Sequence, residues 1–584
     1  MAGRPETYRF GEYTLEAGEH RLLRSSAEVT LRPKVFDTLA YLVTHHGHTV
    51  GKNDLLDAVW PGTFVTEAVL THCIAEIRQA LQDDPHAPRY LKTIPKVGYA
   101  FIAEVHLVGG LAEAGPFLRE VPERRPASTI AVLPFVNLSP DPQNEYLCDG
   151  LSEELINGLT KVPELRVVAH SSSFSFKGRD IDAREIGRQL GAGSILEGSV
   201  RKAGDRLRIS AQLIDTAGGF HVWCEQYDRS LSDVFALQDE ISRSVLGALK
   251  VELCRPGHRA IVTPSTRNIE AYLLYLQGRF FWHRRFAGQL RLAMECFEKA
   301  MQLDPGLALA YAGLADAFGT LGVWAFSPPR EVMPKAAALV RKALELDPVL
   351  AEAHASQGLI HAFYDWAWRP AEQELARAVE LNPGSALTHL WAGHYLSIVG
   401  RFDEAIAEVE HARALDPLSP IVSANVGWTY YLARQPGRAI REVLGVLERH
   451  PGNPIALLYL GFVYAELGKL ADAMSCLRES AATPGGLPWA AESVGWVYGL
   501  LGKPDQAHAV LGESLSRMST AYVPSSAIAC IHLGLGDDDA LFEWLGRCIE
   551  ERDALLPWLK VMPAFDRVRS DPRFQALLAG LGLA

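Results

Sequence analysis

Residues 65–101 read "VTEAVLTHCIAEIRQALQDDPHAPRYLKTIPKVGYAF", and the two halves of this stretch predict a helix followed by a β-hairpin. In the first half, apolar residues recur with helical spacing at Leu70, Ile74, Ile77 and Leu81. This spacing stacks them in one narrow stripe, so we expect a helix that buries the stripe. The second half, residues 89–101, contains three cations and no acid. Such a hairpin is suited to contact with a polyanion, because cations attract phosphate.

The opposite face of the expected helix carries short and only lightly charged side chains. A step of about 100° per residue places on it Ala68, His72, Ala75 and Gln79, with Thr71 and Glu76 on the flanks. A face of this kind can approach a groove closely.

Two further amphipathic segments precede this helix. "RPKVFDTLAYLVTHHGHTV" (32–50) predicts one helix, and "KNDLLDAVWPG" (52–62) predicts a shorter one that ends near its Trp-Pro pair. Three helices followed by a hairpin predict a winged helix, an α+β domain that we place at residues 1–105.

The segments "LRPKVFDTLAYLV", "KNDLLDAVWPG", "LTHCIAEIRQAL" and "PRYLKTIPKVGYAF" resemble the OmpR/PhoB-type winged helix, in the N-terminal form found in CadC-like one-component regulators. The resemblance implies double-stranded DNA as partner: the third helix enters the major groove, the hairpin wing touches the minor groove, and the loop before the helix can meet RNA polymerase. By position it implies base contacts from Thr71 and His72. It implies phosphate contacts from Arg78, Lys92 and Lys96.

The charge balance departs from that of a strong DNA binder. The chain has a formal net charge of −12, and residues 1–105 hold 11 Lys and Arg against 13 Asp and Glu. Val97 and Ala100 stand where relatives often carry Arg, and Glu76 would repel phosphate. We therefore expect weak or cooperative binding that depends on local cationic patches.

A linker and an α/β domain follow. Residues 106–127 lose periodicity and gather Gly, Pro and charge, which indicates a linker. Residues 128–255 alternate short β-rich and helical runs, and this order predicts an α/β domain with a mixed sheet. Segments such as "IAVLPFVNLSPDPQNEYLCDGLSEELINGL" resemble the TolB N-terminal-like domain, which also accompanies some class III adenylate cyclases. No catalytic role follows from this resemblance.

The last part of the chain repeats with a period of 34 residues. Alanines recur at this spacing at positions 371, 405, 439, 473 and 507. Gly427, Tyr430, Ala439 and Pro451 fit one full repeat of the tetratricopeptide type, which this period and pattern resemble. We expect an all-α tetratricopeptide superhelix over residues 266–584, with seven or eight repeats and a C-terminal cap.

The concave side of such a superhelix is expected to bind a protein or peptide partner. Aromatic side chains supply contact area at a low entropy cost. The candidate partner-binding residues are Trp391, Tyr395, Tyr431, Tyr459 and Trp489.

We expect a cytoplasmic, multidomain protein that is not an enzyme and uses no metal or cofactor. The eight cysteines fall singly, without a C-x-x-C pair, as is usual in a reducing compartment. No run approaches the roughly 18 apolar residues of a membrane helix. The segment "HSSSFSFKG" (170–178) lacks the G-x-S-x-G elbow of a serine nucleophile.

These patterns predict a DNA-binding transcription regulator with a sensing or recruiting repeat domain. A rival interpretation is a tetratricopeptide scaffold whose degenerate winged helix binds protein rather than DNA. A weaker alternative is an enzyme within the α/β domain. Retention of residues 1–110 on heparin or DNA at low salt separates the first two.

Overall fold

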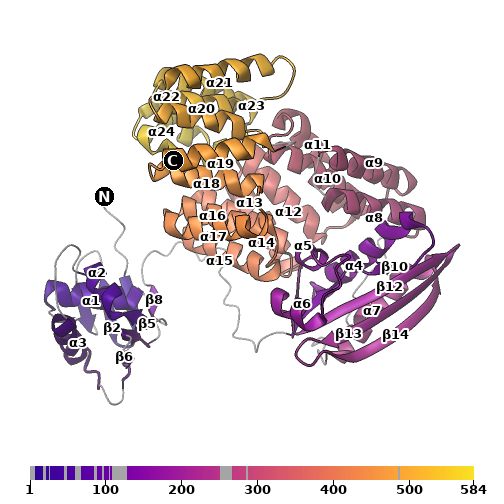
Figure 1. Cartoon of the computed structure of the whole chain (residues 1–584), viewed down its shortest axis with the longest axis horizontal. Helices are drawn as coiled ribbons and strands as arrows, with labels where there is room; N and C mark the ends of the chain where they lie inside the picture. Colours follow the sequence, from indigo (N-terminus) through magenta and orange to yellow (C-terminus); the bar gives the residue numbers. More distant parts are fainter. Residues whose placement is uncertain are drawn as a thin grey trace. The chain divides into compact units, whose positions relative to one another are not determined.

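The computed structural model divides the chain into two compact units, Met1–Gly115 and Pro116–Ala584 (Figure 1). The residues that it describes are 7–16, 21–24, 27–29, 31–44, 46, 49–59, 67–84, 88–94, 98–103, 105–107, 128–162, 164–249, 266–283, 287–483 and 487–583. Lys96 of the expected wing and residues 108–127 of the expected linker lie outside these ranges.

The first unit begins with an antiparallel sheet. Its strands are β1 (Thr7–Phe10), β2 (Tyr13–Glu16), β3 (Arg21–Arg24), β4 (Ala27–Val29) and β8 (His106–Leu107), in the order β4-β3-β2-β1-β8. Because β8 pairs with β1, the sheet continues two residues beyond the boundary at 105 that the sequence suggested. Alternation along β1 and β2 sends Phe10, Tyr13 and Leu15 into the core, where each is fully buried.

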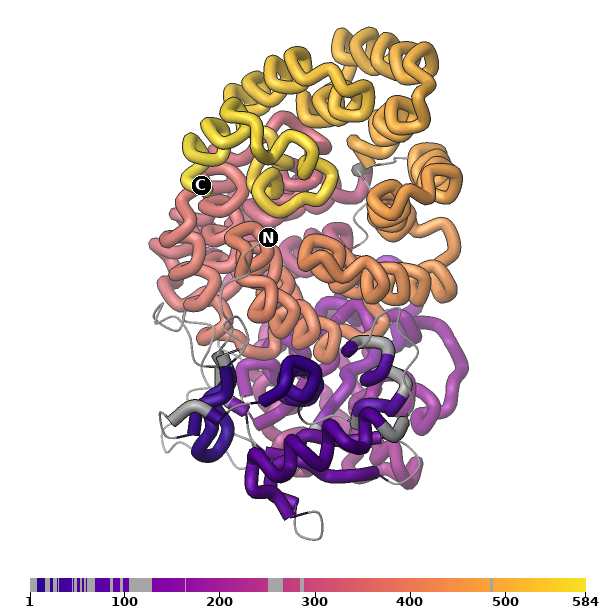
Figure 2. Tube along the Cα trace, turned by 90° about the vertical axis from the view of Figure 1, so that its left-hand side faces the viewer, coloured from indigo at the N-terminus to yellow at the C-terminus, as the bar shows by residue number. Residues whose placement is uncertain are grey.

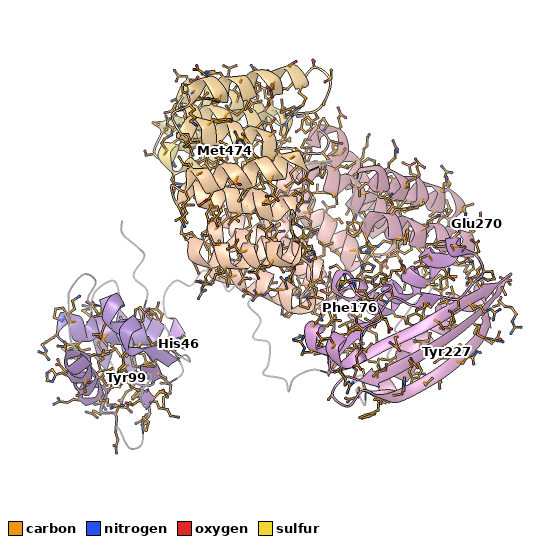
Figure 3. The ribbon with its side chains drawn as sticks, viewed as in Figure 1. His46, Tyr99, Phe176, Tyr227, Glu270 and Met474 are labelled. Atoms are coloured by element: carbon orange, nitrogen blue, oxygen red, sulfur yellow. The ribbon has the colours of Figure 1, made fainter. Side chains whose placement is uncertain are left out.

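Three helices and a small second sheet complete the predicted winged helix. The helices are α1 (Pro33–Thr44), α2 (Lys52–Val59) and α3 (Glu67–Leu81), and the sheet contains β5 (Thr49–Gly51), β6 (Leu91–Ile94) and β7 (Gly98–Phe101) in the order β5-β7-β6. Strands β6 and β7 form the hairpin, and Tyr99 of β7 is buried (Figure 3). At Gly98 a Cβ atom would lie 1.9 Å from the Val50 carbonyl oxygen, so this close strand pairing requires glycine.

The second unit starts with the predicted mixed-sheet domain. Its strands are β9 (Ser128–Val132), β10 (Val136–Asn137), β11 (Leu165–Val167), β12 (Ser194–Ala203), β13 (Arg206–Asp215) and β14 (Phe220–Ser230). The main order is β11-β9-β12-β13-β14, with parallel pairing at β9 and antiparallel pairing from β12 onward. The helices are α4 (Glu145–Leu159), α5 (His170–Phe174), α6 (Ala183–Leu190) and α7 (Val234–Ala248). Tyr227 of β14 is labelled in Figure 3.

Strand β9 is covered on both faces, which explains its continuous apolar run. Ile130 and Val132 join a core with α4 and α7, whereas Ala131 and Leu133 join a second core with α6. The first of these cores continues into the repeats through Tyr272. The α/β domain and the first repeat helices therefore pack as one body.

The repeats form eight antiparallel helix pairs in the described residues (Figure 2). The pairs are α8 (Ile269–His283) and α9 (Ala287–Leu303), α10 (Ala308–Val323) and α11 (Pro329–Leu346), α12 (Ala351–Ile360) and α13 (Trp368–Leu381), α14 (Ala386–Val399) and α15 (Phe402–Leu415), α16 (Pro420–Leu432) and α17 (Pro436–Arg449), α18 (Pro454–Glu466) and α19 (Leu470–Ala482), α20 (Ala490–Leu500) and α21 (Pro504–Arg517), and α22 (Ser525–Leu535) and α23 (Asp538–Glu551).

The repeated glycines mark the closest approach within a pair. A Cβ atom at Gly427 would lie 2.5 Å from a methyl group of Val443, and one at Gly461 would lie 2.6 Å from Leu477. The repeated alanines are buried at the same crossings, with Ala439 fully enclosed. Small residues are needed at these positions because they let the two helix backbones come together.

The C-terminal segment covers the last helix pair and also reaches back across the superhelix. It contains short turns at Leu556–Trp558 and Pro563–Val568 and helix α24 (Pro572–Gly580). The Trp368 indole Nε1 donates to the Leu581 carbonyl oxygen at 2.8 Å, and Arg552 Nη1 donates to the Tyr364 carbonyl oxygen at 3.0 Å. The expected cap thus ties the last pair to the third pair, as Figure 2 shows.

Across the described part of the chain, no helix combines the length and the apolar character that a membrane crossing requires.

Candidate nucleic-acid interface

Helix α3 exposes the face that the sequence assigns to DNA. Its predicted stripe is buried, with none of Leu70, Ile74, Ile77 and Leu81 more than 2% exposed. Thr71 and His72 are exposed, as are Ala75 and Gln79 further along the helix. The structure therefore brings the two candidate base-reading residues together on one open helix surface.

An ion pair neutralises the acid on the flank of this surface. Arg32, just before α1, donates through Nε to both carboxylate oxygens of Glu76 at 3.1 Å and also through Nη2. This contact holds the pKa of Glu76 below its ordinary value, so the carboxylate stays charged but paired. The expected repulsion of phosphate by Glu76 is therefore reduced. No local sequence pattern indicates this pair, since its members lie 44 positions apart.

Arg78, the candidate phosphate contact on α3, is engaged within the domain. Its Nη2 donates to the Leu91 carbonyl oxygen at 3.1 Å and to the Thr93 hydroxyl at 2.8 Å. The guanidinium group therefore fixes the hairpin strand β6 to the helix. A phosphate contact by Arg78 stays a prediction that would have to use its other N–H groups.

A buried carboxylate sets where the hairpin begins. Asp83 Oδ1 accepts from the backbone N–H of Arg89 at 2.6 Å and of Tyr90 at 3.1 Å, and its Oδ2 accepts from that of Leu91 at 2.8 Å. These three bonds satisfy donors that the incoming strand would otherwise leave unpaired. Asp83 thus fixes the spacing between α3 and β6, a role that its sequence context did not reveal.

The cations of the hairpin region remain on the surface. Lys92 is exposed on β6 opposite Ala100, and Arg89 is exposed with its guanidinium carbon 5.5 Å from the centre of the Tyr90 ring. Lys96 lies outside the described residues. The side chains of Arg89 and Lys92 are thus exposed, and phosphate contact by Lys92 stays a prediction.

The five aromatic candidates in the repeats fall into two groups. Trp391, Tyr459 and Trp489 line a small apolar cavity of about 90 Å³ within the repeats. Tyr395 and Tyr431 are buried at 3% and 1% exposure and support the helix packing. Trp558 of the C-terminal segment also lines the cavity and packs against Phe363 and Trp428. Partner binding by the five aromatic residues stays a prediction.

Residues 26–101 match the family model described as "Transcriptional regulatory protein, C terminal". This range includes the three helices and the hairpin. The match confirms the predicted DNA-binding type of the N-terminal unit.

Three relatives extend the comparison. The transcriptional regulator HilA of Salmonella typhimurium is 25% identical over 443 residues, which cover 75% of this chain and 76% of HilA. The transcriptional activator CadC of Escherichia coli is 34% identical over 98 residues, 17% of this chain and 19% of CadC. A Rhizobium meliloti protein named as an adenylate cyclase is 37% identical over 260 residues, and the chain spans 44% of that protein's length. The similarity to regulators confirms the predicted resemblance.

Proposed function

We propose that this chain, a CadC-like regulator with an OmpR/PhoB-type winged helix, regulates transcription by binding duplex DNA through α3 and the β6–β7 hairpin. The observation that carries the proposal is the open face of α3. It presents Thr71 and His72 to solvent while its apolar stripe is fully used in the core. A helix exposed in this way can enter a major groove without disturbing the domain.

The side chains divide into two roles in this proposal. Thr71 and His72 contact base edges, because their short polar groups lie on the exposed face of α3. Lys92, Lys96 and the remaining N–H groups of Arg78 contact phosphates, which sets orientation rather than sequence preference. The Arg32–Glu76 pair keeps the flank of α3 close to neutral.

The second unit receives the signal in this proposal. The repeats bind a protein or peptide partner, and the loop before α3 contacts RNA polymerase. This loop, residues 60–66, lies outside the described residues. A regulator that acts on DNA works in the cytoplasm of a bacterial cell. We assign no catalytic activity to the chain. The name adenylate cyclase belongs to the Rhizobium meliloti relative and is not transferred to this chain.

Fluorescence anisotropy with the full chain and labelled DNA duplexes tests the proposal. We expect the logarithm of affinity to fall linearly with the logarithm of salt concentration, by about 0.9 for each phosphate neutralised. Lys92→Ala should weaken binding equally for all sequences, whereas His72→Ala should change the preference among sequences. Lys299→Ala, an exposed cation on α9, is the matched control and should have no effect.

Affinity that ignores salt would overturn the proposal. Unchanged DNA binding in both Lys92→Ala and His72→Ala would also do so, because the DNA would then be bound by another surface.

A further inference from the structure

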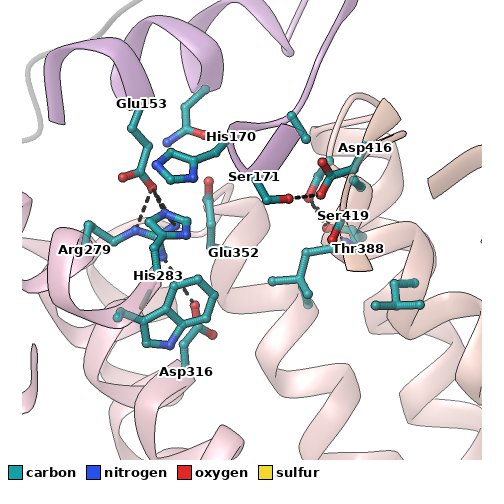
Figure 4. A pocket seen from close by; sticks show the side chains of 18 of the residues that line it. Glu153, His170, Ser171, Arg279, His283, Asp316, Glu352, Thr388, Asp416 and Ser419 are labelled. Atoms are coloured by element: carbon teal, nitrogen blue, oxygen red, sulfur yellow. Dashed lines mark hydrogen bonds and ion pairs between the residues drawn. The ribbon is translucent and has the colours of Figure 1, made fainter. Parts of the chain in front are cut away.

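A cavity of about 680 Å³ lies where the α/β domain meets the repeats (Figure 4). One wall comes from α4 and α5, and the other comes from α8, α10, α12, α14 and α16. The two walls are joined directly, since the Ala169 backbone N–H donates to the Leu415 carbonyl oxygen at 2.8 Å. Asp416 also accepts from the Ser172 backbone N–H at 3.0 Å. A cavity of this size suits a small organic molecule.

The Lys and Arg residues that line the cavity are already held by carboxylates. Arg279 donates to Glu153 Oε1 through Nε at 2.9 Å and through Nη2 at 2.7 Å. Lys177 Nζ lies 2.6 Å from both carboxylate oxygens of Asp149. Burial alone would raise the pKa of Glu153, but Arg279 and His283 hold it well below its ordinary value. An anionic ligand would therefore have to break a formed ion pair.

Two acceptors in the lining lack such partners. The Glu352 carboxylate on α12 makes no hydrogen bond or ion pair with any described residue. Asn382 is only 4% exposed, and its Oδ1 has no hydrogen-bond partner among the described residues. A buried acceptor without a donor costs free energy. Both groups would be satisfied by a ligand that donates hydrogen bonds.

The charge around Glu352 favours a cation. Its side chain points from α12 toward α5, between His170 and Ser171 (Figure 4). Burial and the neighbouring His283 hold the pKa of His170 well below its ordinary value, so this ring is neutral and does not repel a cation. The lining contains more carboxylates than Lys and Arg side chains. The carboxylates belong to Asp149, Glu153, Asp316, Glu352 and Asp416, and the cationic side chains belong to Lys177 and Arg279.

Aromatic rings cover other parts of the wall. They belong to Phe174, Tyr275, Phe280, Trp282, Trp324 and Trp391. Ring faces attract cations and also bury apolar groups. The lining thus combines an unpaired carboxylate with aromatic surface, as sites for organic ammonium groups do.

We propose that this cavity binds a small organic cation that consists of a protonated amine on an aromatic or apolar body. The ammonium group pairs with Glu352 and donates hydrogen bonds to the free acceptors, and the body lies against the aromatic wall. Because the α/β domain and the repeats both line the cavity, a bound ligand stabilises the junction between these two parts.

A metal ion is a poorer occupant. Ligand atoms of Glu153, His170 and His283 lie within 4.8 Å of one another. However, Arg279 Nη2 already donates a hydrogen bond to Glu153 Oε1. The same Nη2 atom lies 3.5 Å from His283 Nε2. The two imidazole rings are stacked at 3.8 Å with an interplanar angle of 9°, so no ion can lie in the planes of both rings.

Three probes of similar shape test the proposal by isothermal titration calorimetry on the full chain: phenethylamine, phenethyl alcohol and 3-phenylpropionate. We expect phenethylamine to bind at least tenfold more tightly than the neutral and the anionic probe. Glu352→Gln should weaken phenethylamine at least tenfold and leave phenethyl alcohol unchanged. Glu448→Gln, an exposed acid on α17 outside the cavity, is the matched control and should behave as wild type.

The proposal is overturned if none of the probes binds, if the alcohol or the acid binds as tightly as the amine, or if Glu352→Gln has no effect. Binding of Zn²⁺ that is lost in His170→Ala, without binding of the amine, would instead identify a metal site. Thermal unfolding of each variant without ligand verifies its fold. The result is independent of DNA binding, because all residues concerned belong to the second unit.

Discussion

Arg32 and Glu76 form an ion pair that ties the residue before α1 to the exposed flank of α3. The pair determines the charge that α3 presents beside its base-reading face. An acidic domain can approach DNA when its nearest carboxylate is compensated locally.

Removing Arg32 should therefore weaken DNA binding beyond the loss of one cation. In Arg32→Ala, Glu76 faces phosphate unpaired, so we expect lower affinity for every sequence. In the double variant Arg32→Ala/Glu76→Gln, affinity should recover in part, because the repulsive charge is also gone. Anisotropy titrations at several salt concentrations measure both effects. Equal affinity in the single and double variants would show that Glu76 does not face the DNA.

Asp83→Asn should loosen the start of the hairpin. The neutral amide has one acceptor oxygen, so it cannot accept from all three backbone N–H groups of residues 89–91. We expect a loss of about 1–3 kcal/mol in the stability of the first unit and faster hydrogen exchange at these amides. Exchange followed by mass spectrometry measures the effect. Asp84→Asn is the control, because the exposed Asp84 side chain makes none of these three bonds; equal exchange in both variants would refute the role of Asp83.

Acid should destabilise the repeats through His394. Burial lowers the pKa of His394 to about 4, although its Nε2 is 3.0 Å from Asn425 Oδ1. The unfolded chain takes up this proton near pH 6.5, before the folded chain does, so stability falls as pH drops from about 6.5 to about 4. The loss from this ring is at most about 3 kcal/mol.

Urea unfolding at a series of pH values, followed by tryptophan fluorescence, measures this dependence. His394→Gln should reduce the slope over pH 4–6.5, while His411, whose pKa burial also lowers to about 4, still contributes. His508→Gln, an exposed residue on α21, should leave the dependence as in wild type. If His394→Gln retains the wild-type slope, another group is responsible.

Truncation should separate DNA binding from its control. A cut at residue 266 would remove Tyr272 and Leu276, which share a core with α4, and would damage the α/β domain. A cut after Gly115 follows the division between the two units. We expect residues 1–115 to bind DNA as the full chain does, while a promoter reporter loses its response to signal. A reporter that still responds would place the sensor in the first unit.

The sequence was most informative where structure repeats or alternates locally. The stripe from Leu70 to Leu81 and the 34-residue spacing of the alanines predicted α3 and the helix pairs, because each pattern reflects contacts made in every turn or repeat. The open face with Thr71 and His72 followed from the same helical geometry.

Contacts between distant residues could not be predicted in this way. The Arg32–Glu76 pair, the use of Arg78 by β6, and the contact of Asp416 with α5 each depend on how separate elements pack. The burial of Tyr431 at 1% has the same origin, since aromatic residues serve helix packing and binding equally well. A single sequence carries no signal that distinguishes these uses.

The most direct test of the central claim is capture of fragmented genomic DNA from the source organism by the purified full chain, followed by sequencing. We expect enriched fragments that share a sequence motif and lie upstream of genes, and we expect this enrichment to be lost in Thr71→Ala/His72→Ala. Lys299→Ala should retain the wild-type profile. No enrichment over a protein-free control, or the same motif in the double variant, would contradict sequence-specific recognition by α3.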